Sequence, residues 1–129
     1  MIATAQLPTG GLVVARSADN GRRWRDLVLK PHKGRILSAG DVLLDGRGEA
    51  WVAYVDGRVR DGKLVGTRVV ARRSRDGGRR FGPATEVLGA ARLLRQAPNL
   101  AMLGRRPTIV LQSGGLTGRD YDIVATRWR

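Results

Sequence analysis

Two eight-residue motifs, 57 positions apart, limit the folds open to this chain more than any other feature of its sequence. Residues 17–24 read SADNGRRW and residues 74–81 read SRDGGRRF, so both fit Ser-x-Asp-x-Gly-x-x-aromatic. A second pair of segments repeats with nearly the same period, because DVLLDGRGEAWVAYV (41–55) aligns with NLAMLGRRPTIVLQS (99–113). Two unrelated motifs that share one period indicate a repeat architecture, in which each unit stacks against its neighbours.

Short apolar and β-branched runs fill these units and predict an all-β fold. The runs are bounded by turn-forming residues, and the turn signals include ADNG, VDGR and RDGG. The expected strands are residues 2–6, 11–17, 25–30, 41–45, 49–55, 64–73, 84–88, 99–103, 107–112 and 121–128. Residues 89–97, GAARLLRQA, could form a turn or two of helix, and we expect them to cross between units as a loop.

Four strands per repeat of this length are typical of the blades of a β-propeller. In the middle unit the motif is the turn between strands 3 and 4 of an antiparallel blade. The blades predicted along the chain are a partial one at residues 1–38, a complete one at 39–96 and a partial one at 97–129. We assign strands 3 and 4 to the first part and strands 1 to 3 to the last.

The motif has the chemistry of a tight hairpin turn. Its Asp can accept N–H bonds from its own turn, its Gly supplies a positive φ, and its Ser closes further local hydrogen bonds. We expect its aromatic residue to point back from strand 4 and bury much of its area between strand layers. The structural residues assigned in this way are Ser17, Asp19, Gly21, Trp24, Ser74, Asp76, Gly78 and Phe81. We expect no cofactor and no metal, because neither motif offers three carboxylates in calcium-ligand spacing.

The charge of the chain favours a polyanionic partner. The net charge is +13, from 24 Lys+Arg against 11 Asp+Glu, and such a field attracts an acidic glycan, nucleic acid or anionic lipid. The cations are mostly arginines spread through the turns, which biased codon usage would also produce. A nucleic-acid-binding domain ranks last, because only 5% of residues are aromatic and the sequence holds no helix-turn-helix, zinc or RNP-like motif.

Several other function classes find no support in the sequence. There is no cysteine, so disulfides, thiolate nucleophiles and cysteine-zinc sites are excluded. The lone histidine, His32, lies between Pro31 and Lys33, as a solvated loop side chain would. We expect no membrane partner, because no run is long and apolar enough to span one. We expect no signal peptide, because the first residues, MIATAQLPTGG, have no basic segment and no long apolar run, and the compartment is left open.

The two motifs resemble the Asp boxes of sialidases and the wider BNR-repeat family. GRGEAWVAYVDG and YDIVATRW resemble the strands that flank those boxes, so the resemblance covers nearly the whole chain. It implies a partial propeller of about two to three blades. The family contains glycosidases and also non-enzymatic receptors and adhesive proteins. In its sialidases, three arginines hold the sialate carboxylate, a Tyr–Glu pair acts as nucleophile and base, and an Asp is the acid.

No catalytic residue of that family is carried over to this chain. The string nearest to the family's Arg-Ile-Pro or Arg-Leu-Pro motif is Arg105-Arg106-Pro107, which departs from it. Tyr54 and Tyr121 lie outside any motif that would identify the nucleophile. We therefore expect a sialidase-like propeller fragment, related to glycoside hydrolases but inactive alone. The alternative is a non-catalytic module that binds glycan or protein and is completed by oligomerisation.

The assigned strands also lead to an expectation about self-association. Propellers of this kind close with about six blades, so a chain of two to three blades leaves sheet edges and apolar faces in water. A first part with strands 3 and 4 and a last part with strands 1 to 3 are roughly complementary. Neighbouring chains could then share one composite blade, and three chains would close a ring. The alternative is an unstable fragment that aggregates through its open faces.

Overall fold

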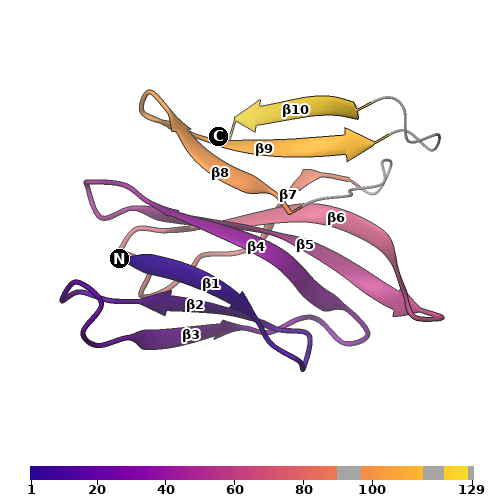
Figure 1. Cartoon of the computed structure of the whole chain (residues 1–129), viewed down its shortest axis with the longest axis horizontal. Helices are drawn as coiled ribbons and strands as arrows, with labels where there is room; N and C mark the ends of the chain where they lie inside the picture. The colour runs from indigo at the N-terminus through magenta and orange to yellow at the C-terminus, as the bar shows by residue number, and fades with distance from the viewer. Residues whose placement is uncertain (90–96, 115–120, 128–129) are drawn as a thin grey trace.

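The computed structural model describes residues 1–89, 97–114 and 121–127, and three antiparallel sheets follow one another along the chain (Figure 1). The N-terminal sheet, in the order β1-β2-β3, contains β1 (Ile2–Gln6), β2 (Leu12–Arg16) and β3 (Arg25–Leu29). The middle sheet, in the order β4-β5-β6-β7, contains β4 (Ile36–Leu44), β5 (Ala50–Arg60), β6 (Lys63–Ser74) and β7 (Thr85–Leu88). The C-terminal sheet, in the order β10-β9-β8, contains β8 (Asn99–Leu103), β9 (Arg106–Gly114) and β10 (Tyr121–Arg127).

The prediction of an all-β fold built from four-stranded antiparallel blades is confirmed. The described residues contain no helix, and the middle sheet is a complete four-stranded blade. The motif turns join β2 to β3 and β6 to β7, so these pairs are strands 3 and 4 of their blades. Most of the segment 89–97, for which a helical turn was an alternative, lies outside the described residues.

The N-terminal sheet has one strand more than the blade assignment gives it, although residues 2–6 are themselves among the expected strands. β1 pairs with β2 from Ile2↔Arg16 to Gln6↔Leu12, and therefore corresponds to β5, which is strand 2 of the middle blade. The assignment of only strands 3 and 4 to this part of the chain is wrong, because the short run 2–6 folds back onto β2. The two partial sheets both contain strands 2 and 3, so they are not complementary. The composite blade therefore loses its basis in the strand count, and self-association stays a prediction.

Two bounds in the middle sheet also differ from the sequence prediction. β4 begins at Ile36, because its ladder with β5 continues beyond an irregularity between Ser38 and Asp41. The string VDGR is not a turn, since β5 runs through it to Arg60. The hairpin instead turns at Asp61 and Gly62, whose φ angles of 50° and 71° suit a tight two-residue connection.

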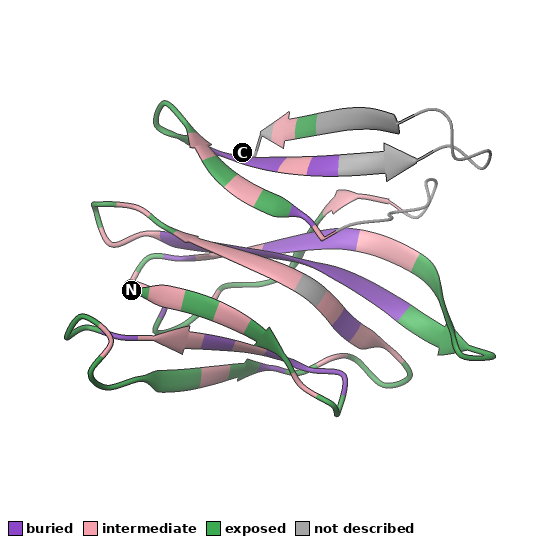
Figure 2. Cartoon of the chain, in the orientation of Figure 1, coloured by how far each residue is buried: buried purple, intermediate pink, exposed green. Residues whose placement is uncertain are grey.

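The middle sheet is covered on both faces, and this is where the core lies. The first eight residues of β5 are all buried, and Figure 2 shows β5 and β6 purple through their central parts. Side chains alternate along a strand, so one face packs against the N-terminal sheet and the other against the C-terminal sheet. The first cluster comprises Leu12, Val14, Leu29, Leu37, Val52, Tyr54 and Val70. The second comprises Ala53, Val69, Ala71, Ile109 and Leu111.

The two clusters form the seams between neighbouring sheets, and these seams hold the sheets together. A fully buried Val, Leu or Ile side chain contributes about 1.5–3 kcal/mol by leaving water, and each seam contains several. The near-continuous burial of β5 explains why its sequence, AWVAYV, is apolar throughout and does not alternate with polar residues. The sheets therefore stack through apolar faces, as propeller blades do.

Candidate functional site

The first motif forms a turn closed by its own side chains. The Oγ of Ser17 donates to Oδ1 of Asp19 at 2.9 Å and accepts from the backbone N–H of Gly21 at 2.8 Å. Oδ1 of Asp19 also accepts from the backbone N–H of Arg23 at 2.8 Å. Gly21 has a φ of 87°, a conformation in which a residue with a Cβ is strained. The turn is thus determined within seven residues of sequence.

The second motif repeats this geometry nearly atom for atom. The Oγ of Ser74 donates to Oδ1 of Asp76 at 2.8 Å and accepts from the N–H of Gly78 at 2.8 Å. The N–H of Arg80 donates to Oδ1 of Asp76 at 2.9 Å, and Gly78 has a φ of 81°. The Ser, Asp and Gly assigned from the sequence have the same hydrogen-bonding role in both turns.

The charge state of the two motif aspartates also indicates a structural role. The backbone N–H of Arg23 lowers the pKa of Asp19 from its ordinary value of 3.8, and the motif serine lowers it further. The N–H of Arg80 does the same to the pKa of Asp76. Both carboxylates stay ionised at neutral pH, whereas a general acid needs a raised pKa. No group of three His, Asp or Glu that could hold a metal ion occurs among the residues described.

The two motif aromatics differ in their surroundings. Phe81 packs against the first core cluster, as expected, but Trp24 is 43% exposed, and its predicted burial is wrong. The indole Nε1 of Trp24 donates to the carbonyl of Gly21 at 3.0 Å, so the ring lies over its own turn. The physical reason is the position of the blade. Phe81 has the N-terminal sheet to pack against, whereas no sheet among the described residues covers the corresponding side of the N-terminal blade.

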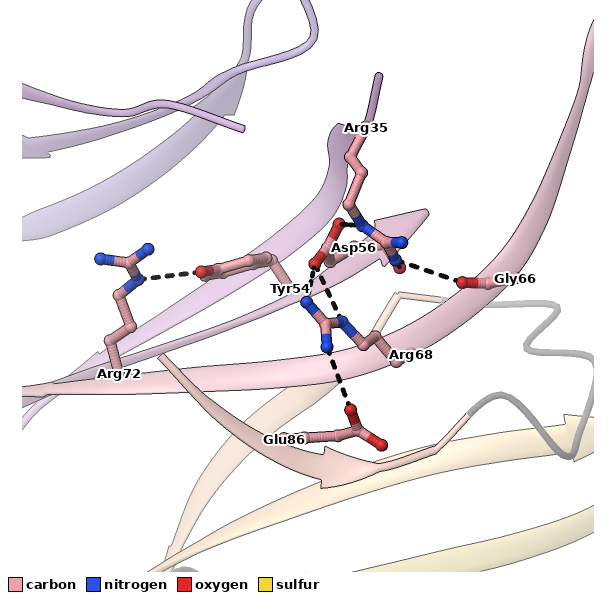
Figure 3. A network of polar contacts seen from close by, with 7 residues as sticks. All are labelled: Arg35, Tyr54, Asp56, Gly66, Arg68, Arg72 and Glu86. Atoms are coloured by element: carbon pink, nitrogen blue, oxygen red, sulfur yellow. Dashed lines mark hydrogen bonds and ion pairs between the residues drawn. The ribbon is translucent and has the colours of Figure 1, made fainter. Parts of the chain in front are cut away.

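A polar network lies at the opposite end of the middle blade from the motif turns and centres on Asp56 (Figure 3). The Nε of Arg35 lies 2.5 Å from Oδ1 of Asp56, and the Nη2 of Arg68 lies 2.8 Å from Oδ2. Arg35 also donates to the carbonyls of Asp56 and Gly66, at 3.2 Å each. The Nη1 of Arg68 reaches Oε2 of Glu86 at 3.2 Å. The network therefore connects the residue before β4 with β5, β6 and β7.

This network stabilises the blade, and its central carboxylate is fully engaged. The side chain of Asp56 is 6% exposed, and both of its oxygens accept from a guanidinium, so no oxygen is available to a substrate. The hydrogen bonds that Arg68 donates to Asp56 raise the pKa of the Arg68 guanidinium above its ordinary value. A buried carboxylate between two arginines satisfies the requirement that buried charges be paired.

None of the four charged residues of this network was predicted from the sequence. Asp56 and Arg68 are cross-strand partners, but the reading of VDGR as a turn conceals that register. Arg35 was a possible signal, since Arg35-Ile36-Leu37 departs from Arg-Ile-Pro only in its third residue. Because the guanidinium of Arg35 is engaged by Asp56, that partial match does not identify a free carboxylate-binding arginine.

The residues weighed as catalytic candidates are not brought together where the structure describes their side chains. Tyr54 is 1% exposed inside the first seam, and its hydroxyl accepts from Nε of Arg72 at 2.9 Å. Arg105 and Arg106 are exposed at the turn from β8 to β9, on the same side as the motif turns. The side chain of Tyr121 lies outside what the structure describes. His32 is exposed in the connection from β3 to β4.

Comparison with solved structures supports the propeller architecture. The fold is similar to that of an alpha-L-arabinanase from Penicillium chrysogenum, solved in complex with arabinobiose, with a TM-score of 0.57 and 18% sequence identity. The match covers 98% of this chain and 39% of the arabinanase chain, so this chain spans about two fifths of that enzyme. No protein-family model and no curated protein matches the sequence. In the part of the chain that is described, no helix is long and apolar enough to cross a membrane.

Proposed function

We propose that this chain is part of a glycan-active propeller of the sialidase-like type, with its catalytic groups on blades other than those seen here. The observation that carries the proposal is the pair of equivalent Asp-box turns between strands 3 and 4. The likeness to an arabinanase that binds arabinobiose supports the wider glycan-related class. The resemblance of the motifs to Asp boxes favours the sialidase-like type within that class.

The isolated chain is expected to be inactive for a geometric reason. Glycosidase chemistry needs an acid and a second carboxylate or tyrosinate that face one substrate. Here Asp56 is held by arginines and Tyr54 is buried between two sheets. Productive geometry also has to be held to within about 0.5 Å, which requires a closed ring of blades.

The test is to sequence the DNA on both sides of the coding region and then assay the complete reading frame. We expect further Ser-x-Asp-x-Gly-x-x-aromatic motifs in frame, and hydrolysis of a fluorogenic sialoside by the complete product. Cleavage of an arabinofuranoside alone would assign a different glycosidase activity and refute the sialidase type. The proposal is refuted if the complete reading frame contains no further motifs and its product binds no glycan.

A non-catalytic module completed by oligomerisation is the second candidate, and the free face of the N-terminal sheet favours it. This face carries Ala3, Ala5, Val13, Ala15 and Val28. Val28 is 44% exposed, and Trp24 at the motif turn is 43% exposed, although its counterpart Phe81 is packed in a seam. On the C-terminal sheet, Leu103 is 63% exposed. A second copy that placed its C-terminal sheet on this face would bury both surfaces, and two chains would supply about six blades.

Light scattering coupled to size exclusion tests this second candidate. We expect wild-type particles heavier than the 14.0 kDa monomer, and a Val28→Lys variant that shifts to the monomer. Val59→Lys is the matched control, because Val59 is 55% exposed on the β5–β6 hairpin and away from the free face. Equal effects of the two substitutions, or a monomeric wild type, would refute assembly through this face.

A further inference from the structure

A pocket of about 350 Å³ lies where the first motif turn meets the second, at the end of the blades opposite Asp56. It is lined by Arg16, Ala18, Asp19, Arg23, Arg25 and Arg79. Four of these six residues are arginines, and they come from two blades. Stabilisation of the fold does not explain why these four arginines lie together, because none of their side chains donates a hydrogen bond to another described residue.

The register of the sheets explains how the pocket forms. Arg16 and Arg25 are cross-strand partners at the ends of β2 and β3, and both strands present these ends to the seam with the middle blade. The side chain of Arg16 extends over the second motif turn, since a Cβ added at Gly77 would lie 3.8 Å from its Nε. Arg79 completes the pocket from that second turn.

The internal repeat supplies a matched comparison. A second pocket, of about 420 Å³, is lined by Arg73, Arg75, Asp76, Arg80 and Gly82, which stand 57 positions after residues 16, 18, 19, 23 and 25, and also by Pro83 and Thr85. In this second pocket two of the three arginines are paired. Arg73 forms an ion pair with Glu49, and the Nε of Arg80 lies 3.6 Å from Asp76.

In the first pocket, none of the four arginines forms an ion pair with another described residue. Its one acid, Asp19, directs Oδ1 to the backbone N–H of Arg23 and to Ser17 instead of to a guanidinium. Four guanidinium groups against one carboxylate leave a net positive charge in a concave site, where an anion relieves their mutual repulsion. The guanidinium fork also matches the oxygens of a sulfate or carboxylate in bidentate fashion.

We infer that this pocket binds the sulfate or carboxylate groups of an acidic glycan, on the side of the propeller that carries the Asp boxes. The anion-binding part stands on the pocket itself, and the choice of a glycan rests on the proposed function. A discrete pocket favours a glycan over nucleic acid, which is bound along charged grooves with stacking aromatics. The site is separate from the Asp56 network, which lies at the other end of the strands.

Binding of a heparin octasaccharide, measured by isothermal titration calorimetry at fixed ionic strength, tests the inference. The pocket variant is Arg23→Gln/Arg79→Gln, and the control is Arg22→Gln/Arg80→Gln. Arg22 and Arg79 are equivalent positions of the repeat, and so are Arg23 and Arg80. All four residues are exposed, and each variant lowers the net charge of +13 by two. We expect the dissociation constant to rise about tenfold or more for the pocket variant and less than about threefold for the control.

Two comparisons make the outcome decisive. Equally weakened binding in both variants, or no binding of the octasaccharide to the wild type, would refute the assignment of this pocket as the binding site. The chemically desulfated octasaccharide should bind at least about tenfold more weakly than the sulfated one. If single-stranded DNA binds as tightly and depends on the same two arginines, the glycan assignment is wrong. Neither result bears on hydrolysis by the complete reading frame, so this inference and the proposed function fail separately. Unchanged melting temperatures establish that both variants fold.

Discussion

Replacing Ser74 by alanine should destabilise the protein more than the equivalent change at Ser17. Ser74 is fully buried, and its Oγ accepts from the N–H of Gly78, which is itself buried. Ser17 is 4% exposed, but the N–H that it accepts belongs to Gly21, which is only half-buried. Equivalent hydrogen bonds are therefore lost in different environments, and this difference sets the size of the effect.

The magnitude follows from what each deletion leaves unpaired. A buried donor without an acceptor costs about 1–3 kcal/mol, whereas a hydrogen bond that water can replace contributes about 0.5–1.5 kcal/mol. We therefore expect Ser74→Ala to lower the free energy of unfolding by about 2 kcal/mol and Ser17→Ala by about 1 kcal/mol. For a chain of this size, 1 kcal/mol corresponds to about 3–5 °C in melting temperature.

Urea unfolding followed by circular dichroism measures both changes. Ser38→Ala is the control, because Ser38 is half-buried in β4 and its hydroxyl has no side-chain hydrogen bond among the described residues. It should stay within about 0.5 kcal/mol of wild type. If Ser74→Ala is no more destabilising than Ser38→Ala, the motif hydroxyls do not hold the turns, and the reasoning from their hydrogen bonds is wrong.

Four further predictions concern charge, acid, activity and metal. Asp56→Ala leaves Arg35 and Arg68 without their carboxylate and should cost about 3 kcal/mol in urea unfolding; a cost below about 1 kcal/mol would contradict the paired network. The lowered folded-state pKa values of Asp19 and Asp76 mean that their stabilisation is complete above the ordinary value of 3.8 and is lost as the pH falls through the lower folded-state values. Changing both to Asn should therefore flatten the decline in melting temperature below that pH, and an unchanged decline would contradict the assignment. The isolated chain should not hydrolyse a fluorogenic sialoside; turnover abolished by Tyr54→Phe or Tyr121→Phe would show otherwise. Low-millimolar calcium should not raise the melting temperature, and a rise that a chelator reverses would reveal a site.

The parts of the fold that depend on local chemistry could be predicted from the sequence. The turn of the first motif is determined by Ser17, Asp19 and Gly21, which hydrogen-bond within a few residues of one another. The repeat period then indicates that the second motif forms the same turn. The order of strands in the middle blade follows in the same way, because each hairpin joins neighbours in the chain.

The parts that depend on distant partners could not be predicted in this way. The pairing of residues 2–6 with β2 creates a third strand that the repeat pattern alone does not assign. The exposure of Trp24 depends on which sheet covers that side of the blade, and the motif carries no information about this. Asp56 meets Arg35 and Arg68 only after the register of β4, β5 and β6 is known.

Native-state hydrogen exchange tests most directly the claim that the chain consists of propeller blades stacked face to face. At low protein concentration, the amides of β5 and β6 should exchange most slowly, because both faces of their sheet are covered. The amides of β1 and β3 should exchange faster, because one face of their sheet is open. Protection that is equal in the N-terminal and middle sheets at low concentration, or absent from β5 and β6, would contradict the stacked arrangement.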